Sequence, residues 1–339
     1  MTAGNRNRTR TGRRTARSAR TKRRDWRPWV LGALAIIVAA VVVGVLVNRS
    51  GSADGTAGAP ASGAASSQKT AGAPAPGAAL SEIKTPDFHS MAISPADSQV
   101  VLYGHHGGIL RSADGGRSWQ KTNLTGNTDD AMGMGISMSD PDIAYAAGHG
   151  TFFRSSDAGK TWTSLKPKLP STDIHGMAVS PDQSAVLYAH VVGQGLFRSD
   201  DSAETWKKTN SQPLPADIMQ VAASTGGRVY VASMKNGILR SDDGGATFKA
   251  TSAFQGGVLS VATEAVDPNV VYAGTDSQLF VSPDGGATWT ARQLPVAGQV
   301  LVTGVNPRDA NDVMVVAVGS DRVGRVYRSR DGGASWPAN

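Results

Sequence analysis

The residues best suited to bind a ligand or a metal are six histidines, all in the middle of the chain. They are His89, His105, His106, His149, His175 and His190. Two methionines, Met132 and Met134, lie between His106 and His149, and the chain has no cysteine. Imidazole and thioether ligands without a thiolate suit copper, particularly Cu(I). We therefore expect these eight residues to line a ligand site, with His105, His149 and His190 as candidate ligands of copper or zinc.

The histidines are predicted to lie along one edge of a set of antiparallel sheets. His89 and His175 open predicted inner strands, whereas His105, His190 and His149 follow the tyrosine that ends the next strand. In an antiparallel pair, the start of one strand and the end of the next lie on the same side. The six side chains would then share one rim. The alternative is that the histidines cap turns and the methionines fill the core.

The strands that would position these residues are marked by an eight-residue motif that occurs six times. It reads Ser-x-Asp-x-Gly-x-(Thr/Ser)-Trp, with Ala203 replacing the glycine once and Phe248 the tryptophan once. Its aspartates are Asp114, Asp157, Asp201, Asp243, Asp284 and Asp331. The serines that begin the copies are 43, 44, 42, 41 and 47 residues apart. A fixed period in this range indicates one supersecondary unit copied six times.

The repetition favours a structural role for the six aspartates over a role as acids or metal ligands. Apolar residues and an arginine, such as Ile109-Leu110-Arg111, precede most copies and indicate a strand that enters a tight turn. Serine and aspartate side chains accept hydrogen bonds from turn amides, and glycine supplies the backbone angle that the turn needs. An active site is needed once, whereas a turn is needed in every unit.

The motif resembles the Asp-box, or BNR, repeat of sialidases, sortilin-type receptors, xyloglucanases and photosystem assembly factors. This resemblance implies an all-β fold, a six-bladed β-propeller with one four-stranded blade per repeat, over residues 80–339. Four segments also resemble motifs of an uncharacterised bacterial Asp-box family labelled glycosyl-hydrolase-like or sialidase-like: Asp87-Phe88-His89, Asp130-Ala131-Met132-Gly133, Gly148-His149 and Ile174-His175-Gly176. Such proteins share the blade and not the chemistry.

Closure of the ring requires a strand from outside the last repeat. Only Pro337, Ala338 and Asn339 follow the sixth motif, whereas earlier copies continue for several strand residues. The sixth blade would therefore lack its fourth strand and leave an exposed edge. We expect residues 80–84 to supply this strand.

The first 79 residues predict a tail, a membrane span and a linker. Residues 1–28 hold eleven Arg or Lys and one acid, which predicts a disordered tail. Residues 29–47 include eighteen consecutive uncharged apolar residues, about 27 Å of helix, enough to cross a bilayer. Basic residues before the span place the N-terminus in the cytoplasm and the propeller outside the plasma membrane. Residues 48–79, rich in Gly, Ala, Pro and Ser, predict a linker. A cleaved signal peptide is the alternative, although the apolar run is long for one.

The positive net charge of the chain comes from its N-terminal tail. The net charge is +7, and the tail carries eleven positive and one negative side chain, so the remainder carries −3. A domain without a basic face is not expected to bind nucleic acid.

A sialidase-like glycoside hydrolase is the alternative function. Resemblance to sialidases would imply three arginines around the substrate carboxylate, a tyrosine with a glutamate, and an acid/base aspartate. The predicted inner strands contain no arginine, and Glu264 is their single glutamate. Four further carboxylates are expected near the rim with Glu264, as solvated strand-end groups: Asp129, Asp130, Asp173 and Asp217. The sequence does not favour an enzyme. It predicts a membrane-anchored extracytoplasmic module that binds an extracellular protein, a glycan or a metal, with residues 29–47 in the lipid bilayer.

Overall fold

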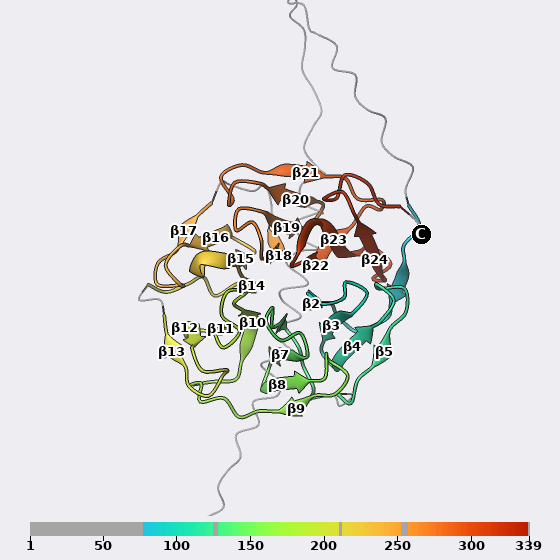
Figure 1. Ribbon diagram of the computed structural model, residues 1–339. Coiled ribbons are helices and arrows are strands. Elements are labelled where there is room, and N and C mark those ends of the chain that lie inside the picture. The colour runs from blue at the N-terminus through green and yellow to red at the C-terminus, as the bar shows by residue number, and fades with distance from the viewer. Residues whose placement is uncertain (1–76, 125–127, 210–211, 252–256, 338–339) are drawn as a thin grey trace, which may run out of the picture. The chain divides into compact units, whose positions relative to one another are not determined.

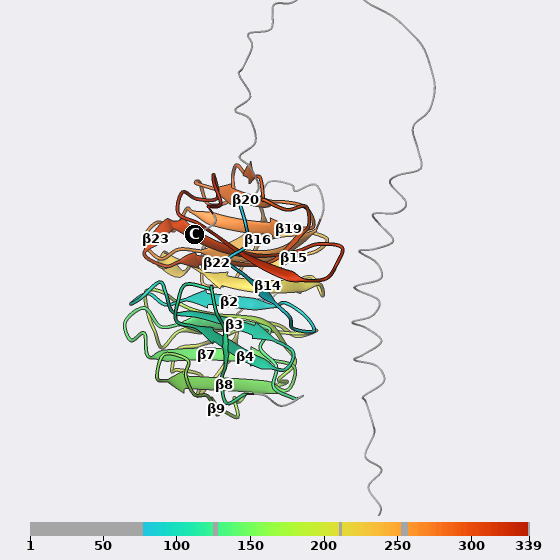
Figure 2. The same ribbon diagram turned by 90° about the vertical axis from the view of Figure 1, so that its right-hand side faces the viewer.

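The computed structural model describes residues 77–124, 128–209, 212–251 and 257–337. Within these ranges the strands form six four-stranded antiparallel sheets, arranged as blades around a central axis (Figure 1). Figure 2 shows the same ring from the side. The predicted six-bladed β-propeller is confirmed. The predicted tail and membrane span, and nearly all of the predicted linker, lie outside the described residues. Among the residues described, no helix is long and apolar enough to cross a membrane.

Each blade consists of an inner, a second, a third and an outer strand. The inner strands are β2 (Ser90–Ile93), β6 (Gly133–Ile136), β10 (Ile174–Val179), β14 (Ile218–Ala223), β18 (Val258–Thr263) and β22 (Gln299–Asn306). The second strands are β3 (Val101–His105), β7 (Ile143–Gly148), β11 (Leu187–Val191), β15 (Val229–Ser233), β19 (Val271–Thr275) and β23 (Asp309–Val318). The third strands are β4 (Gly108–Ser112), β8 (Thr151–Ser156), β12 (Gly195–Ser199), β16 (Gly237–Ser241), β20 (Leu279–Ser282) and β24 (Gly324–Ser329). The outer strands are β5 (Gln120–Lys121), β9 (Thr163–Ser164), β13 (Lys207–Lys208), β17 (Lys249–Ala250), β21 (Thr290–Arg292) and β1 (Ser81–Ile83). A short 3-10 helix, η1 (Thr225–Gly227), precedes β15.

The core lies between neighbouring blades, so the second strands are buried on both faces. Every residue of β3, β11, β15 and β19 is buried, and the outer strands are largely exposed. The largest fully buried side chains are the five tyrosines of the second strands of blades one to five: Tyr103, Tyr145, Tyr188, Tyr230 and Tyr272. Continuous apolar runs with an aromatic ring at their centre suit a sheet that is covered on both faces.

The Asp box closes the turn between the third and outer strands. In blade one, Ser112 Oγ donates to Asp114 Oδ1 (2.8 Å) and accepts from the amide of Gly116 (2.8 Å). Asp114 Oδ1 also accepts from the amide of Ser118 (2.9 Å). The same bonds recur in the other five blades. Although slight burial opposes it, hydrogen bonds from Ser118 and Ser112 lower the pKa of Asp114 to about 2.

The arginines that precede the boxes of blades one and four each connect two blades. Arg111 Nε donates to the carbonyl of Ala158 (2.9 Å), and Arg240 Nη1 donates to that of Gly285 (2.9 Å). In both cases the carbonyl belongs to the Asp box of the next blade. These arginines are therefore structural ties, in agreement with their repetition in the sequence.

The N-terminal strand β1 completes the sixth blade. It pairs antiparallel with β24, with Ser81 opposite Val326 and Ile83 opposite Gly324. Ser81 Oγ donates to the carbonyl of Gly116 (2.5 Å) and accepts from Trp119 Nε1 (3.0 Å), both in blade one. Ile83 is buried against the core. The expected closure of the ring by residues 80–84 is confirmed.

Candidate functional site

A cluster of four histidines and three aspartates lies at the end of the propeller where the inner strands begin. Each of its aspartates lies one to three residues before an inner strand, and its histidines lie beside these aspartates. We call this cluster the His/Asp rim; it consists of Asp87, His89, His106, Asp130, His149, Asp173 and His175. Isolated backbone bridges His106–Asp130 and His149–Asp173 join blade one to blade two and blade two to blade three. The rim therefore spans three consecutive blades.

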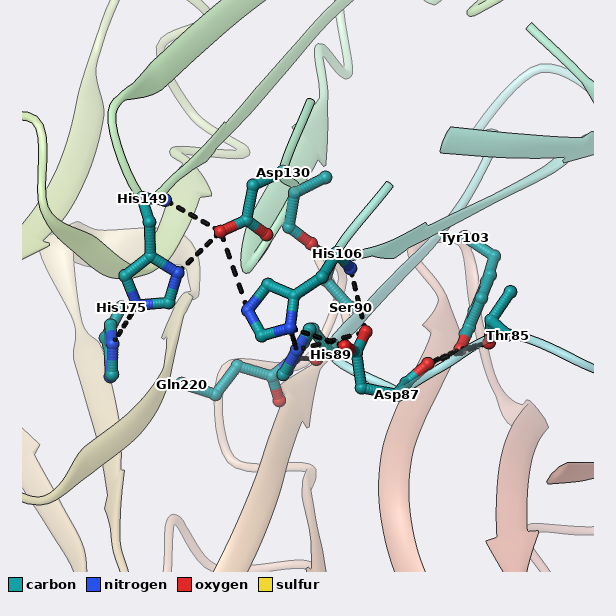
Figure 3. Close-up of polar contacts among 11 residues, drawn as sticks. Thr85, Asp87, His89, Ser90, Tyr103, His106, Asp130, His149, His175 and Gln220 are labelled. Carbon is teal, nitrogen blue, oxygen red and sulfur yellow. Dashed lines mark hydrogen bonds and ion pairs between the residues drawn. The ribbon is translucent and has the colours of Figure 1, made fainter. Parts of the chain in front are cut away.

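The side chains of the rim form a continuous row of contacts, and Figure 3 labels all of them except Asp173. In blade one, Asp87 Oδ1 accepts the backbone amide of His106 (2.7 Å) and Asp87 Oδ2 contacts His106 Nδ1. His89 Nε2 lies 3.3 Å from Asp87 Oδ1 and 3.3 Å from His106 Nδ1. On the other side of the His106 imidazole, Nε2 lies 3.6 Å from Asp130 Oδ2. His106 thus connects a carboxylate of its own blade to one of the next.

The same arrangement recurs one blade later. Asp130 Oδ2 accepts the backbone amide of His149 (2.9 Å) and contacts His149 Nδ1 (2.5 Å). His149 Nε2 lies 2.7 Å from His175 Nε2 and 3.6 Å from Asp173 Oδ1. Within the described ranges, three groups bring together donor atoms that could hold a metal: Asp87/His89/His106, His106/Asp130/His149 and His149/Asp173/His175.

The local backbone explains why the aspartates and histidines meet. An aspartate at the start of an inner strand accepts the amide of the residue that follows the second strand, which fixes the corner of the blade. Asp217 of blade four accepts the amide of Lys235 (2.7 Å), the second residue after β15, where no histidine is present. Gly148 leaves room for the Asp130 carboxylate, because a Cβ there would lie 2.7 Å from Asp130 Cγ. The aspartates therefore have a backbone role, to which blades one and two add an imidazole.

His175 is directed toward the rim by an irregularity in β10. Ile174 pairs with Val191 and Met177 with Ala189, so His175 and Gly176 together lie opposite a single residue of β11. Gly176 has φ 107°, which favours glycine. A β-bulge of this kind bends a strand and re-aims the side chain that it carries.

The surroundings of Asp87 and Asp130 lower the pKa of both carboxyl groups. Burial opposes ionisation of Asp87 and Asp130, but hydrogen bonds from His106 and His89 lower the pKa of Asp87, and the bond from His149 and the charge of His106 lower that of Asp130. Burial also opposes protonation of His106, yet its bond to Asp87 and the charge of Asp130 raise its pKa. Burial and the neighbouring His149 lower the pKa of His175 to about 3, so this ring is neutral at pH 7.

Two of the predicted ligand residues, His105 and His190, lie inside the second strands β3 and β11. His105 is 8% exposed and stacks on Tyr103, with ring centroids 6.0 Å apart. His190 is 2% exposed, and burial lowers its pKa to about 4. Among the described residues, neither belongs to a group that could hold a metal, whereas His149 belongs to two.

The methionines lie in the core. Met132 and Met134 are 2% and 7% exposed, and Met134 packs with Ile109 and Phe153. Met134 also lines a cavity of about 130 Å³ on the propeller axis, to which all six inner strands contribute. Gln220, which lines the same cavity, accepts from the amide of Val261 (2.9 Å) and donates to the carbonyl of His89 (3.3 Å). The donor atoms gathered at the rim are therefore imidazoles and carboxylates.

The expected set of solvated carboxylates needs correction at two positions. Asp130 is 5% exposed rather than solvated, because the corner of blade two closes over it. Glu264 follows the end of β18 and so lies at the opposite end of an inner strand from the rim. It is 3% exposed and accepts the amides of Val266 (2.8 Å) and Asp267. Glu264 caps a turn.

Asp87 and Asp130 do not have the properties that the acid of a glycosidase needs. A paired-carboxylate glycosidase uses one carboxylic acid whose pKa is raised, so that it can protonate the leaving group. The pKa values of Asp87 and Asp130 are instead lowered by their histidine neighbours. These two residues are suited to hold cations or hydrogen-bond donors.

A pattern in the sequence could have revealed the rim. Asp87, Asp130, Asp173 and Asp217 are 43, 43 and 44 residues apart, and each is followed two residues later by histidine or methionine. His106 and His149 each follow their aspartate by 19 residues. The interval equals the blade repeat, so it marks equivalent positions in successive blades.

Comparisons with known proteins agree with the fold. Residues 84–214 match the family described as "Photosynthesis system II assembly factor YCF48". The match covers less than half of the chain, which is a six-bladed β-propeller with an Asp box in each blade. No curated protein matches its sequence. The structure titled "YCF48 bound to D1 peptide" is similar at 15% identity and a TM-score of 0.51, covering 76% of this chain and 84% of that one.

Two other solved propellers have a similar fold at low sequence identity. "YCF48 from Cyanidioschyzon merolae" is 17% identical with a TM-score of 0.52, over 77% of this chain and 88% of that one. "Structure of U3-55K" is 10% identical with a TM-score of 0.56, over 74% and 98%. At these identities the similarity concerns the fold, and the function of this BNR-type propeller must be argued from its own site.

Proposed function

We propose that this protein is a binding scaffold that holds a segment of a partner protein against the His/Asp rim. The observation that carries the proposal is that the His/Asp rim lies entirely within the part of the chain that matches the assembly-factor family. Residues 84–214, which match the assembly-factor family, contain all seven residues of the rim and the three blades that present them. None of these side chains belongs to an Asp box or to a hydrophobic core cluster, and those of His106 and His149 are 25% and 20% exposed.

The chemistry of the rim suits a peptide. Its carboxylates accept hydrogen bonds from amides and cationic side chains, and its imidazoles can donate or accept. The similar structure titled "YCF48 bound to D1 peptide" contains a peptide on a propeller of this fold. That title describes the other protein, and it supports a peptide segment over a glycan as the partner for this one.

The proposal places the propeller outside the plasma membrane, anchored by residues 29–47. The support is the charge pattern of the sequence, in which eleven basic residues precede the apolar run. Because the chain has no cysteine, single cysteines can report topology directly. We expect Ser66→Cys to react in intact cells with a membrane-impermeant maleimide and Thr9→Cys to react only after lysis. Labelling of both in intact cells, or of neither, would contradict the proposed orientation.

Site-specific photo-crosslinking in the native membrane tests the binding face. A photoreactive amino acid replaces Thr172 or Gln194, which flank the rim, or Lys160 or Glu204 in Asp boxes as matched controls. We expect the two rim positions to crosslink to the same partner protein and the two controls to give no product with it. Equal crosslinking from both ends of the propeller, or none from the rim, would overturn the proposal. Hydrolysis of fluorogenic sialosides, glucosides or xylosides by the wild type that Asp130→Asn abolishes would also contradict it.

A further inference from the structure

The group His149/Asp173/His175, the third group of the rim, brings together three donor atoms, and the orientation of His149 is fixed by Asp130. His149 Nε2, His175 Nε2 and Asp173 Oδ1 lie within 4.8 Å of one another. They come from the end of β7 in blade two and the start of β10 in blade three. Rigid strand ends place all three, which favours a defined geometry over a chance encounter of mobile side chains.

The hydrogen bond of His149 Nδ1 directs the lone pair of Nε2 toward His175 Nε2, 2.7 Å away, where a metal would take the place of the hydrogen bond between the two rings. An ionised carboxylate can only accept, so the 2.5 Å contact requires His149 Nδ1 to donate to Asp130 Oδ2. The lone pair of the neutral ring is then on Nε2, which points toward His175 (Figure 3). A carboxylate that accepts from the far nitrogen of a histidine is the usual support of a metal-binding imidazole, because it fixes the tautomer and the ring orientation.

Two buried oxygen atoms at this site have no hydrogen-bond partner among the described residues. They are Asp173 Oδ1, in the donor group, and Asp130 Oδ1, behind His149. The Asp130 side chain is 7% exposed, and that of Asp173 is 49% exposed. A buried carboxylate oxygen without a partner is costly, and a cation bound by Asp173 Oδ1 would offset that cost at Asp173.

We propose that His149 Nε2, His175 Nε2 and Asp173 Oδ1 bind one divalent transition-metal cation, with Zn²⁺ as the probe, and that Asp130 is a positioning residue for His149. This metal site rests on the proposed function in one respect only, namely that the metal and the partner protein would bind the same rim. Two imidazoles and one carboxylate form a known zinc-binding set in which water completes the tetrahedron. The two Nε2 atoms, now 2.7 Å apart, would separate to about 3.3 Å around a metal at 2.0–2.1 Å.

The other two groups are less suited to this role. His106 Nδ1 is already engaged by Asp87. In the central group, Asp130 Oδ2 and His149 Nδ1 bond to each other. Blade one does offer a matched control, because Asp87 supports His106 as Asp130 supports His149. At the position equivalent to His175, 43 residues earlier, the chain has Met132.

The choice of donors also discriminates between metals. Nitrogen and carboxylate oxygen ligands suit Zn²⁺ and Cu²⁺, whereas Cu(I) prefers sulfur. Met132 and Met134 are buried in the core. The metal at this site is therefore expected to be a dication rather than the Cu(I) that imidazole and thioether ligands in the sequence would favour.

Calorimetric titration of the chelator-treated, full-length chain with Zn²⁺ tests the proposal. We expect one site per chain, no detectable binding to His149→Gln or His175→Gln, and at most a few-fold loss of affinity in His106→Gln, whose imidazole lies 3.6 Å from the positioning residue Asp130. Asp130→Asn should raise the Kd by roughly 10–100-fold. Thermal melts of every variant with chelator show that each is folded. Co²⁺ replaces Zn²⁺ in a second titration, and its visible absorption band should appear in the wild type and vanish with His175→Gln.

The contrary outcomes are equally defined. Absence of Zn²⁺ binding by the folded wild type overturns the metal site, and so does wild-type affinity in the His149→Gln/His175→Gln double variant. Loss of binding in His106→Gln with retention in His175→Gln overturns the assignment to the third group. Crosslinking of the chelator-treated wild type to its partner is a separate measurement. The metal site can thus fail while the partner-binding scaffold stands, and the reverse.

Discussion

The two ends of the propeller use the same repeat in different ways. At one end, the Asp box forms six times with the same hydrogen bonds, from Ser112 to Ser329. At the other end, the corner aspartate occurs in four blades, and imidazoles join it only in blades one to three. The two ends are opposite because a third strand such as β4 begins two residues after His106 and ends at the Asp-box serine. Uniformity marks the part that holds the ring together, and departure from uniformity marks the part that is free to bind.

The largest expected effect tests closure of the ring, on which both ends depend. Deleting residues 78–86 removes β1, and the loss of buried Ile83 alone costs roughly 2–5 kcal/mol. The deletion also exposes the edge of β24. We expect the whole domain to lose its cooperative thermal transition, measured by circular dichroism. Removing nine residues from the predicted linker, 60–68, is the matched control. Equal melting temperatures for the two deletions would show that β1 is dispensable.

The fold could be predicted from the sequence because its determinants are local. Each Asp box bonds within eight residues, so a repeated octapeptide is enough to count the blades. The missing outer strand after Trp336 likewise follows from a count of residues, and β1 supplies it.

The site could be predicted only in part because it depends on strand register. His105 and His106 are neighbours, yet one stacks on Tyr103 in the core and the other contacts Asp87 on the rim. Side chains alternate between faces, so a shift of one residue at the end of β3 exchanges these roles. His175 reaches the rim through a bulge at Gly176, which hydrophobic periodicity does not reveal.

Acid should weaken the Asp-box end through its carboxylates. Hydrogen bonds from Thr247 and Ser241 lower the pKa of Asp243 from 3.8 to about 2. A carboxyl whose pKa is lower in the folded state stabilises that state above pH 3.8, and this contribution is lost as the pH falls to about 2. In metal-free buffer, we expect Asp243→Asn to melt below the wild type at pH 7 and the two melting temperatures to converge near pH 2. A difference that does not change with pH would show that the carboxylate charge has no part in the box.

A single box serine should affect stability more than a rim histidine does. Ser241→Ala leaves the buried amide of Gly245 without its 2.8 Å partner, which costs about 1–3 kcal/mol. For a domain of this size, this corresponds to roughly 2–10 °C in Tm. His106→Gln changes a partly exposed side chain and should lower Tm by less. Differential scanning calorimetry compares the two, and a larger loss for His106→Gln would mean that the rim, too, holds the ring together.

The smallest expected effect concerns the third Asp box, where the uniform end itself departs from its pattern. Its two turn residues, Ser202 and Ala203, have φ 60° and 75°, whereas blade one has Gly115 and Gly116 at these positions. A left-handed conformation costs an L-residue about 1–2 kcal/mol, and glycine avoids this cost. The greater freedom of glycine in the unfolded chain cancels roughly 0.5–1 kcal/mol of that gain. Ser202 is exposed, whereas Ala203 packs in the core, so Ser202→Gly relieves strain without opening a cavity. We expect Ser202→Gly to raise Tm by roughly 1–4 °C and Ser202→Ala to leave it unchanged. A glycine variant that melts below the alanine variant would mean that the backbone of this box differs from the other five.

The same two variants also test whether stability at one end of a blade is independent of binding at the other end. The rim of blade three carries His175, so Zn²⁺ affinity should be equal in Ser202→Gly and Ser202→Ala.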